Sequence, residues 1–193
     1  MILYDLLERA GFRTLARKLY RVQLHGAEHI PSTGGVILAA NHESLFDPWL
    51  LALATPRPVR YMAKSDLWRF PLVGRALDAF GAFPVERGAG DATAISNAAE
   101  LLRRGEVLGI FPQGTSKQLR QRPYHRGAAR LALATGAPIV PIRLIDTRGL
   151  PRPGRPRAQV IVGEPILVEP AKPTLVAAKE LTKRVERRLV AAQ

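Results

Sequence analysis

The chain of 193 residues contains no cysteine, which excludes a disulfide bond, a thiolate metal site and a cysteine nucleophile together. Histidine is scarce as well, and the four histidines are His25, His29, His42 and His125. So few histidines argue against a multi-histidine metal centre, and we expect neither a metal nor a bound cofactor. The lack of cysteine does not identify a cellular compartment.

Long apolar runs are also missing. The longest stretch without a charged residue, 29–42, has 14 residues with Pro, Ser and Thr among them, whereas a membrane-spanning helix needs about 20 apolar residues. The N-terminus carries Asp5 and Glu8 where a secretory signal would have a basic start and an unbroken apolar stretch. These features predict a soluble or peripheral protein.

Acidic residues are outnumbered, because 29 lysines and arginines face 16 aspartates and glutamates and give a net charge of +13. Such a charge attracts nucleic acid, an anionic membrane or a phosphorylated substrate, and an ordinary solvated basic surface is the alternative. Aromatic residues make up only 6% of the chain, and the arginine-rich stretch 117–157 has one, Tyr124, to stack on bases. We therefore expect no nucleic acid.

The remaining pattern alternates short apolar runs with helical periodicity. Residues 2–20 place leucines at helical spacing between arginines, which predicts one amphipathic basic helix, or two broken near Gly11. We expect residues 1–20 to form this segment and 21–193 to form one domain. The expected strands are 21–25, 35–41, 59–64, 82–86, 106–111, 138–144 and 158–163. The first expected helix begins at Pro48, and the others cover 72–80, 91–105, 126–136 and 174–192. This order predicts an α/β fold with a mostly parallel or mixed central sheet flanked by helices.

Polar residues follow two of these strands, at the edge of the sheet where α/β folds collect ligands. In the first group, His42 and Asp47 are five residues apart, which is about 140° around a helix, so they can meet only if the chain turns between them. Pro48 favours that turn, because it disfavours helical geometry at Asp47 and suits the first helical position itself. An aspartate that binds one imidazole nitrogen leaves the other free to act as a general base.

Two alternatives stand beside this interpretation. Asp47 before Pro48 is also a good N-cap for the following helix, and a lone histidine in a loop is usually a surface residue. The chain has no G-x-S-x-G motif, so a covalent serine mechanism has little support.

Four blocks in order extend the pattern: NHESLFD (41–47), GAFPVER (81–87), FPQGT (111–115) and APIVP (137–141). With these blocks, residues 22–165 resemble the 1-acylglycerol-3-phosphate acyltransferase (lysophosphatidate acyltransferase) family of glycerolipid acyltransferases. The resemblance implies a glycerolphosphate-acyltransferase-like fold. It also implies transfer of an acyl group from acyl-CoA or acyl carrier protein to the free hydroxyl of lysophosphatidate or a related lysophospholipid.

The resemblance also implies roles for individual residues. His42 would be the general base, oriented by Asp47. Arg87 would hold the acceptor phosphate, because a planar guanidinium suits a phosphate. Gly114 and Thr115 would bring hydrogen-bond donors to the same anion, and Lys64 is a further candidate for it.

Gln113 stands where the family usually has Glu, and Ser116 where it often has Arg. Glutamine keeps the size and one acceptor oxygen of glutamate but loses its charge. This departure concerns the identity of the acceptor or the rate, and Gln113 belongs to the expected substrate site.

The basic N-terminal segment then has a use, since an amphipathic helix in an anionic interface would bring the site to a lipid acceptor. An ordinary helix packed on the sheet is the alternative. We expect a cytoplasmic protein that is peripheral on the inner face of the cell membrane. A lipid-binding relative that has lost turnover is the main alternative to an enzyme.

Overall fold

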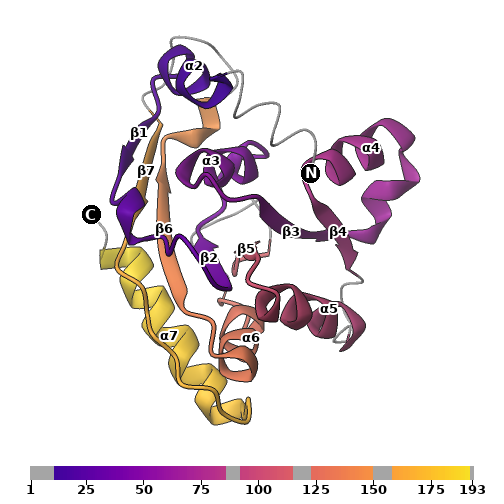
Figure 1. The fold of residues 1–193 in the computed structure, drawn as a ribbon, viewed down its shortest axis with the longest axis vertical. Coiled ribbons are helices and arrows are strands. Elements are labelled where there is room, and N and C mark those ends of the chain that lie inside the picture. The colour runs from indigo at the N-terminus through magenta and orange to yellow at the C-terminus, as the bar shows by residue number, and fades with distance from the viewer. Residues whose placement is uncertain (1–10, 86–91, 115–122, 150–157, 192–193) are drawn as a thin grey trace.

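The computed structural model describes residues 11–85, 92–114, 123–149 and 158–191. Within these residues, seven strands form one mixed sheet in the order β1-β7-β6-β2-β5-β3-β4 (Figure 1). Neighbouring strands are parallel except for β6 and β7, which are antiparallel. The strands are β1 (Gln23–His25), β2 (Val36–Ala40), β3 (Val59–Lys64), β4 (Ala82–Val85), β5 (Val107–Ile110), β6 (Ile139–Ile145) and β7 (Gln159–Val162). The predicted α/β fold is confirmed.

The direction of the crossovers explains how the helices divide between the two faces. The connections β2–β3 and β3–β4 run toward the β4 edge, and the connections β4–β5 and β5–β6 run back. Because such crossovers are right-handed, the first two helices must cover one face and the next two the other. Figure 1 shows this arrangement. Helices α3 (Asp47–Ala54) and α4 (Pro71–Ala79) lie on one side of the sheet, and α5 (Ala92–Arg103), α6 (Gly127–Thr135) and α7 (Leu175–Ala191) lie on the other.

The core is divided in the same way. All five residues of β2 are buried, because helices cover the sheet on both faces. Leu38 packs in a cluster with Leu50 of α3, and the preceding Ile37 packs in a second cluster with residues of α5, α6 and α7. This double burial holds the ends of β2 and β5 in place, and the candidate site is built on those ends.

Near the N-terminus, helix α2 (Phe12–Leu19) is tied to α3. The Arg17 guanidinium donates to the carbonyl of Leu53 at 2.6 Å, and Tyr20 meets Trp49 edge to face with ring centroids 5.2 Å apart. A helix is therefore present in the second half of the predicted amphipathic segment, and residues 1–10 lie outside the described residues. Among the helices that the structure describes, none is both long enough and apolar enough to cross a membrane.

The boundaries differ from those predicted by one or two residues in most elements. Among the described residues, three short 3-10 helices were not predicted: η1 (Ala27–His29), η2 (Ser65–Arg69) between β3 and α4, and η3 (Thr147–Gly149). The first residue of the helix expected over 91–105, Asp91, lies outside the described residues.

Candidate active site

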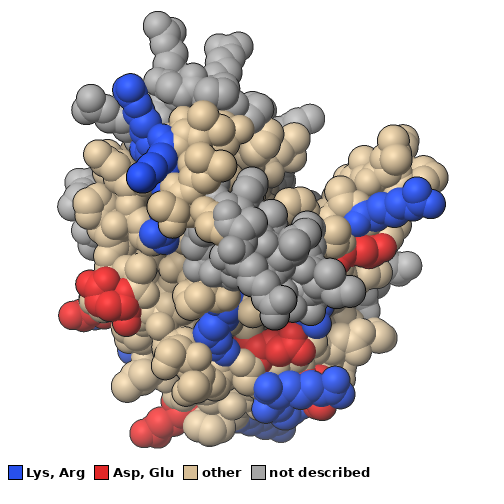
Figure 2. Space-filling view, turned by 45° about the horizontal axis from the view of Figure 1, so that its top comes forward, with Lys and Arg blue, Asp and Glu red and all other residues tan. Residues whose placement is uncertain are grey.

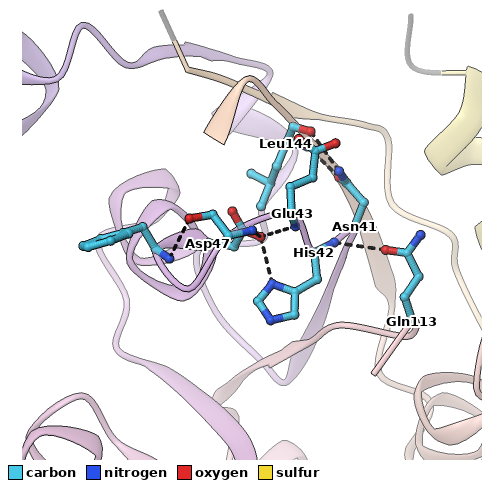
Figure 3. A network of polar contacts seen from close by, with 8 residues as sticks. Asn41, His42, Glu43, Asp47, Gln113 and Leu144 are labelled. Carbon is cyan, nitrogen blue, oxygen red and sulfur yellow. Dashed lines mark hydrogen bonds and ion pairs between the residues drawn. The ribbon is translucent and has the colours of Figure 1, made fainter. Parts of the chain in front are cut away.

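The candidate site lies at the carboxyl edge of the sheet (Figure 3). His42 follows β2, and Gln113 and Gly114 follow β5, its parallel neighbour in the sheet. The ends of these two strands therefore bring together two of the polar groups that the sequence separates by about 70 residues.

The chain between His42 and Asp47 turns back on itself. Asp47 begins α3, with Pro48 after it, and one carboxylate oxygen, Oδ2, accepts three hydrogen bonds from the loop. The donors are Nδ1–H of His42 at 2.8 Å, the backbone N–H of Glu43 at 2.5 Å and that of Ser44 at 2.8 Å. The His–Asp contact predicted from the sequence is present. The N-cap alternative for Asp47 is wrong, because its carboxylate faces the loop and the N-cap position belongs to Phe46, which makes no side-chain cap.

This arrangement determines which nitrogen of His42 is available. The Asp47 side chain is fully buried, and a buried carboxylate needs such donors to stay charged. Its bond to Nδ1 places the proton there and leaves a lone pair on Nε2. Among the described residues, none hydrogen-bonds Nε2, and the imidazole is 16% exposed. The ring also stacks on Phe111, with centroids 4.3 Å apart, which limits its rotation.

Gln113 supports the histidine directly. Its Oε1 accepts a hydrogen bond from the backbone N–H of His42 at 3.0 Å, and the glutamine is buried. Gln113 was expected to face the substrate, and in the structure this oxygen connects the end of β5 to the loop that carries His42.

Asn41 has a similar role that sequence reasoning did not assign. Its side-chain amide donates to the carbonyl of Leu144 at 2.8 Å, and its Oδ1 accepts from the backbone N–H of Leu144 at 2.7 Å. The two bonds join the end of β2 to β6. The sequence did offer one signal for this role, because Asn41 is a polar amide directly after a fully apolar strand.

Gly114 has a conformation and an environment that require glycine. Its φ is +73°, and a Cβ atom there would lie 3.1 Å from Nε2 of His125. A side chain at this position would be strained by the positive φ and would require the His125 ring to shift by a few tenths of an ångström. Thr115 and Arg87, the other residues expected at the acceptor phosphate, lie outside the described residues.

Lys64 ends β3, at the same edge of the sheet. Its ammonium group pairs with Asp66, and this pairing lowers the pKa of the Asp66 carboxyl. Lys64 makes no hydrogen bond or ion pair with His42, Asp47 or Gln113, so it lies near this edge without reaching the His–Asp pair.

Glu43 lies next to the His42–Asp47 pair, and the pKa of its own carboxyl is perturbed. Partial burial raises the pKa of the Glu43 carboxyl, Arg148 opposes this, and the carboxylates of Asp47 and Asp146 raise it further. Among the described residues, there is no cluster of three or more His, Asp or Glu side chains that could hold a metal ion.

Comparison with known proteins bears on what this site does. The family profile described as Acyltransferase matches residues 21–145. The 1-acyl-sn-glycerol-3-phosphate acyltransferase of Bacillus subtilis is 31% identical over 147 residues, which are 75% of this chain and 73% of that protein. The protein of the same name from Borreliella burgdorferi is 32% identical over 130 residues, 66% of this chain and 52% of the relative.

The fold has a solved counterpart. The crystal structure of the 1-acyl-sn-glycerophosphate acyltransferase PlsC from Thermotoga maritima aligns with a TM-score of 0.71 and 23% sequence identity, and it covers 97% of this chain and 77% of that one. The family match over residues 21–145 and the Bacillus relative together show that this chain belongs to the acyltransferase family of enzymes.

Proposed function

We propose that the enzyme transfers an acyl group from an acyl thioester to the free hydroxyl of lysophosphatidate or a related lysophospholipid, a step of phospholipid biosynthesis. Nε2 of His42 takes the hydroxyl proton, and the oxygen attacks the thioester carbonyl carbon. The C–S bond then breaks, and the departing thiolate takes the proton from His42. The products are an ester and a free thiol, and no protein nucleophile is needed.

The observation that carries this proposal is the contact between His42 and Asp47. A general base needs a free lone pair and a fixed orientation, and the 2.8 Å bond to Asp47 supports both. When His42 takes the proton, the imidazolium lies against the buried Asp47 carboxylate, which stabilises the new charge. General base catalysis of this kind contributes about 10²–10⁴-fold to a rate.

The acceptor phosphate would be held by Arg87, Gly114 and Thr115. Gly114 follows Gln113, whose side chain binds the backbone N–H of His42. An anion bound at Gly114 would therefore lie near the base. Lys64 is a weaker candidate, because its charge is already balanced by Asp66. The basic surplus of the chain favours anionic substrates in general.

The acyl donor would be acyl-CoA or acyl carrier protein, and both are thioesters. The acceptor carries a hydrocarbon chain, so the enzyme would work at an anionic membrane surface, as a peripheral protein on the cytoplasmic face. The exposed leucines Leu15 and Leu19 lie four residues apart on α2 beside Lys18, an arrangement that suits an interfacial helix.

A direct assay tests the reaction. Purified enzyme is incubated with acyl-CoA or acyl carrier protein and lysophosphatidate, and thiol release and the acylated product are measured for the wild type and His42→Ala. We expect release that depends on both acceptor and His42. A series of acceptors with other headgroups separates a wrong acceptor from a wrong reaction, and if no acceptor gives His42-dependent release, the proposal fails.

A further inference from the structure

Helix α4 is apolar in sequence and yet almost entirely exposed. Of its nine residues only Gly74 is buried, whereas five of the eight residues of α3 are buried. Large apolar side chains are exposed along 65–80, a segment that we call the α4 arm. They are Leu67, Phe70, Leu72, Val73 and Phe80, with Leu72 at 79% and Phe70 at 63% exposure. Exposed apolar surface of this kind marks an interaction site.

The α4 arm stands away from the body of the molecule. It lies on the same side of the sheet as α3, the helix that begins at Asp47, and it projects beyond the β3–β4 edge (Figure 1). In Figure 2 the end of the molecule where α4 lies stands out from the rest, and a basic side chain runs along its otherwise mostly uncharged surface. The loop that carries His42 also exposes an apolar side chain, Leu45, at 85%.

Charged residues flank the apolar side chains. Arg69, which is 80% exposed, and Arg75 lie on either side of Phe70, Leu72 and Val73. Of the two acidic residues, Asp66 is paired with Lys64 and Arg69, and Asp78 accepts a hydrogen bond from the indole N–H of Trp68. The arm therefore combines an apolar tip with two exposed guanidinium groups.

We propose that the α4 arm inserts its apolar side chains into an anionic lipid bilayer while Arg69 and Arg75 bind lipid phosphates. Consecutive residues of a helix point about 100° apart, so Leu72 and Val73 face different directions, and both are exposed. A protein partner would cover one stripe of the helix, whereas the acyl region of a bilayer surrounds an inserted tip. The arginines match the charge of the anionic headgroups.

This inference rests on the proposed function for its purpose. A lysophospholipid acceptor resides in a bilayer, and insertion of the arm would hold the face that carries α3 and Leu45 against that bilayer. The acceptor could then enter the site without leaving the membrane completely. The membrane contact is additional to the one proposed for residues 1–20, because α4 is a separate element at the far edge of the sheet.

Vesicle sedimentation of the full chain without substrates tests the proposal. The variant Leu72→Ser/Val73→Ser is compared with Leu175→Ser/Val176→Ser, a matched Leu-Val pair that is also exposed but belongs to α7 on the other side of the sheet. On vesicles of phosphatidylcholine and phosphatidylglycerol, we expect the α4 variant to bind at least about tenfold more weakly than the wild type. The α7 variant should bind as the wild type does. Thermal melting checks that each variant is folded.

A further double variant examines the charge. Arg69→Gln/Arg75→Gln should weaken binding by about tenfold when phosphatidylglycerol is present and leave binding to pure phosphatidylcholine unchanged. Equal partition of the wild type and the Leu72→Ser/Val73→Ser variant overturns the proposal. So does a wild-type dimer that becomes monomeric in this variant while vesicle binding stays the same, because the arm would then be a subunit interface.

A separate measurement keeps the two proposals apart. Acyl transfer to a short-chain acceptor that is dissolved as a monomer does not need a membrane, so the α4 variant should turn it over at the wild-type rate. If the wild type acylates none of the acceptors, while the α4 substitutions still weaken vesicle binding, the proposed function fails and the membrane contact stands.

Discussion

The side-chain oxygen of Gln113 accepts a hydrogen bond from the backbone N–H of His42 at 3.0 Å, across 71 positions of the sequence. This bond connects the loop after β5 to the loop after β2, and it explains why a residue with an acceptor oxygen follows Phe111-Pro112. A glutamate would offer the same acceptor with an added charge. The glutamate that the family resemblance implies at this position could therefore support His42 in the same way.

Gln113→Glu should keep or raise activity. The carboxylate can accept the same bond from His42, and its charge would favour the imidazolium that forms during the reaction. Gln113→Leu has a similar size but removes the acceptor, so kcat should fall while the protein stays folded. Steady-state kinetics of the three proteins provide the check. Complete loss of activity in Gln113→Glu would show instead that the neutral glutamine is adapted to a particular acceptor.

Asp47→Asn should lower kcat by about 10²–10⁴-fold with a small change in KM. The amide can still accept from the backbone N–H groups of Glu43 and Ser44, but it lacks the charge that orients Nδ1–H and stabilises the imidazolium. Kinetics with saturating donor and acceptor measure this effect. A rise in KM with an unchanged kcat would instead assign Asp47 a purely structural role.

The sheet and the His–Asp contact could be predicted because local pattern determines them. Buried strands appear as apolar runs, and Pro48 favours a turn between His42 and Asp47, although α3 begins at Asp47 itself, one residue before the predicted start. The partner of Asn41 could not be predicted, because Leu144 is 103 positions away and no local signal says that β6 lies beside β2. Similarly, residues 72–80 predict a helix, but whether its apolar side chains are covered depends on tertiary packing, and in α4 they are not.

Asn41→Ala should destabilise the fold and disorder the loop that carries His42. The change removes both hydrogen bonds to Leu144 and leaves a backbone N–H and C=O without these partners, at a cost of about 1–3 kcal/mol each where they are buried. Urea denaturation measures the free energy of unfolding. Asn41→Asp is the informative companion, because it keeps the acceptor for the N–H of Leu144 but loses the donor to its carbonyl, and its stability should lie between the other two. Wild-type stability in Asn41→Ala would contradict the role assigned to this residue.

Glu43→Gln should stabilise the protein at neutral pH. Partial burial and the nearby carboxylates raise the pKa of Glu43, so the folded state binds its proton more tightly than the unfolded state does. The charged form therefore weakens folding at neutral pH, and this penalty disappears as the pH falls through the raised pKa and below the unfolded value of about 4.3. The variant has no charge to bury, so its advantage in urea denaturation should be present at about pH 7 and absent near pH 4. An advantage of the same size at both pH values would show that the gain comes from packing or hydrogen bonding of the amide, because a titrating carboxylate cannot produce it.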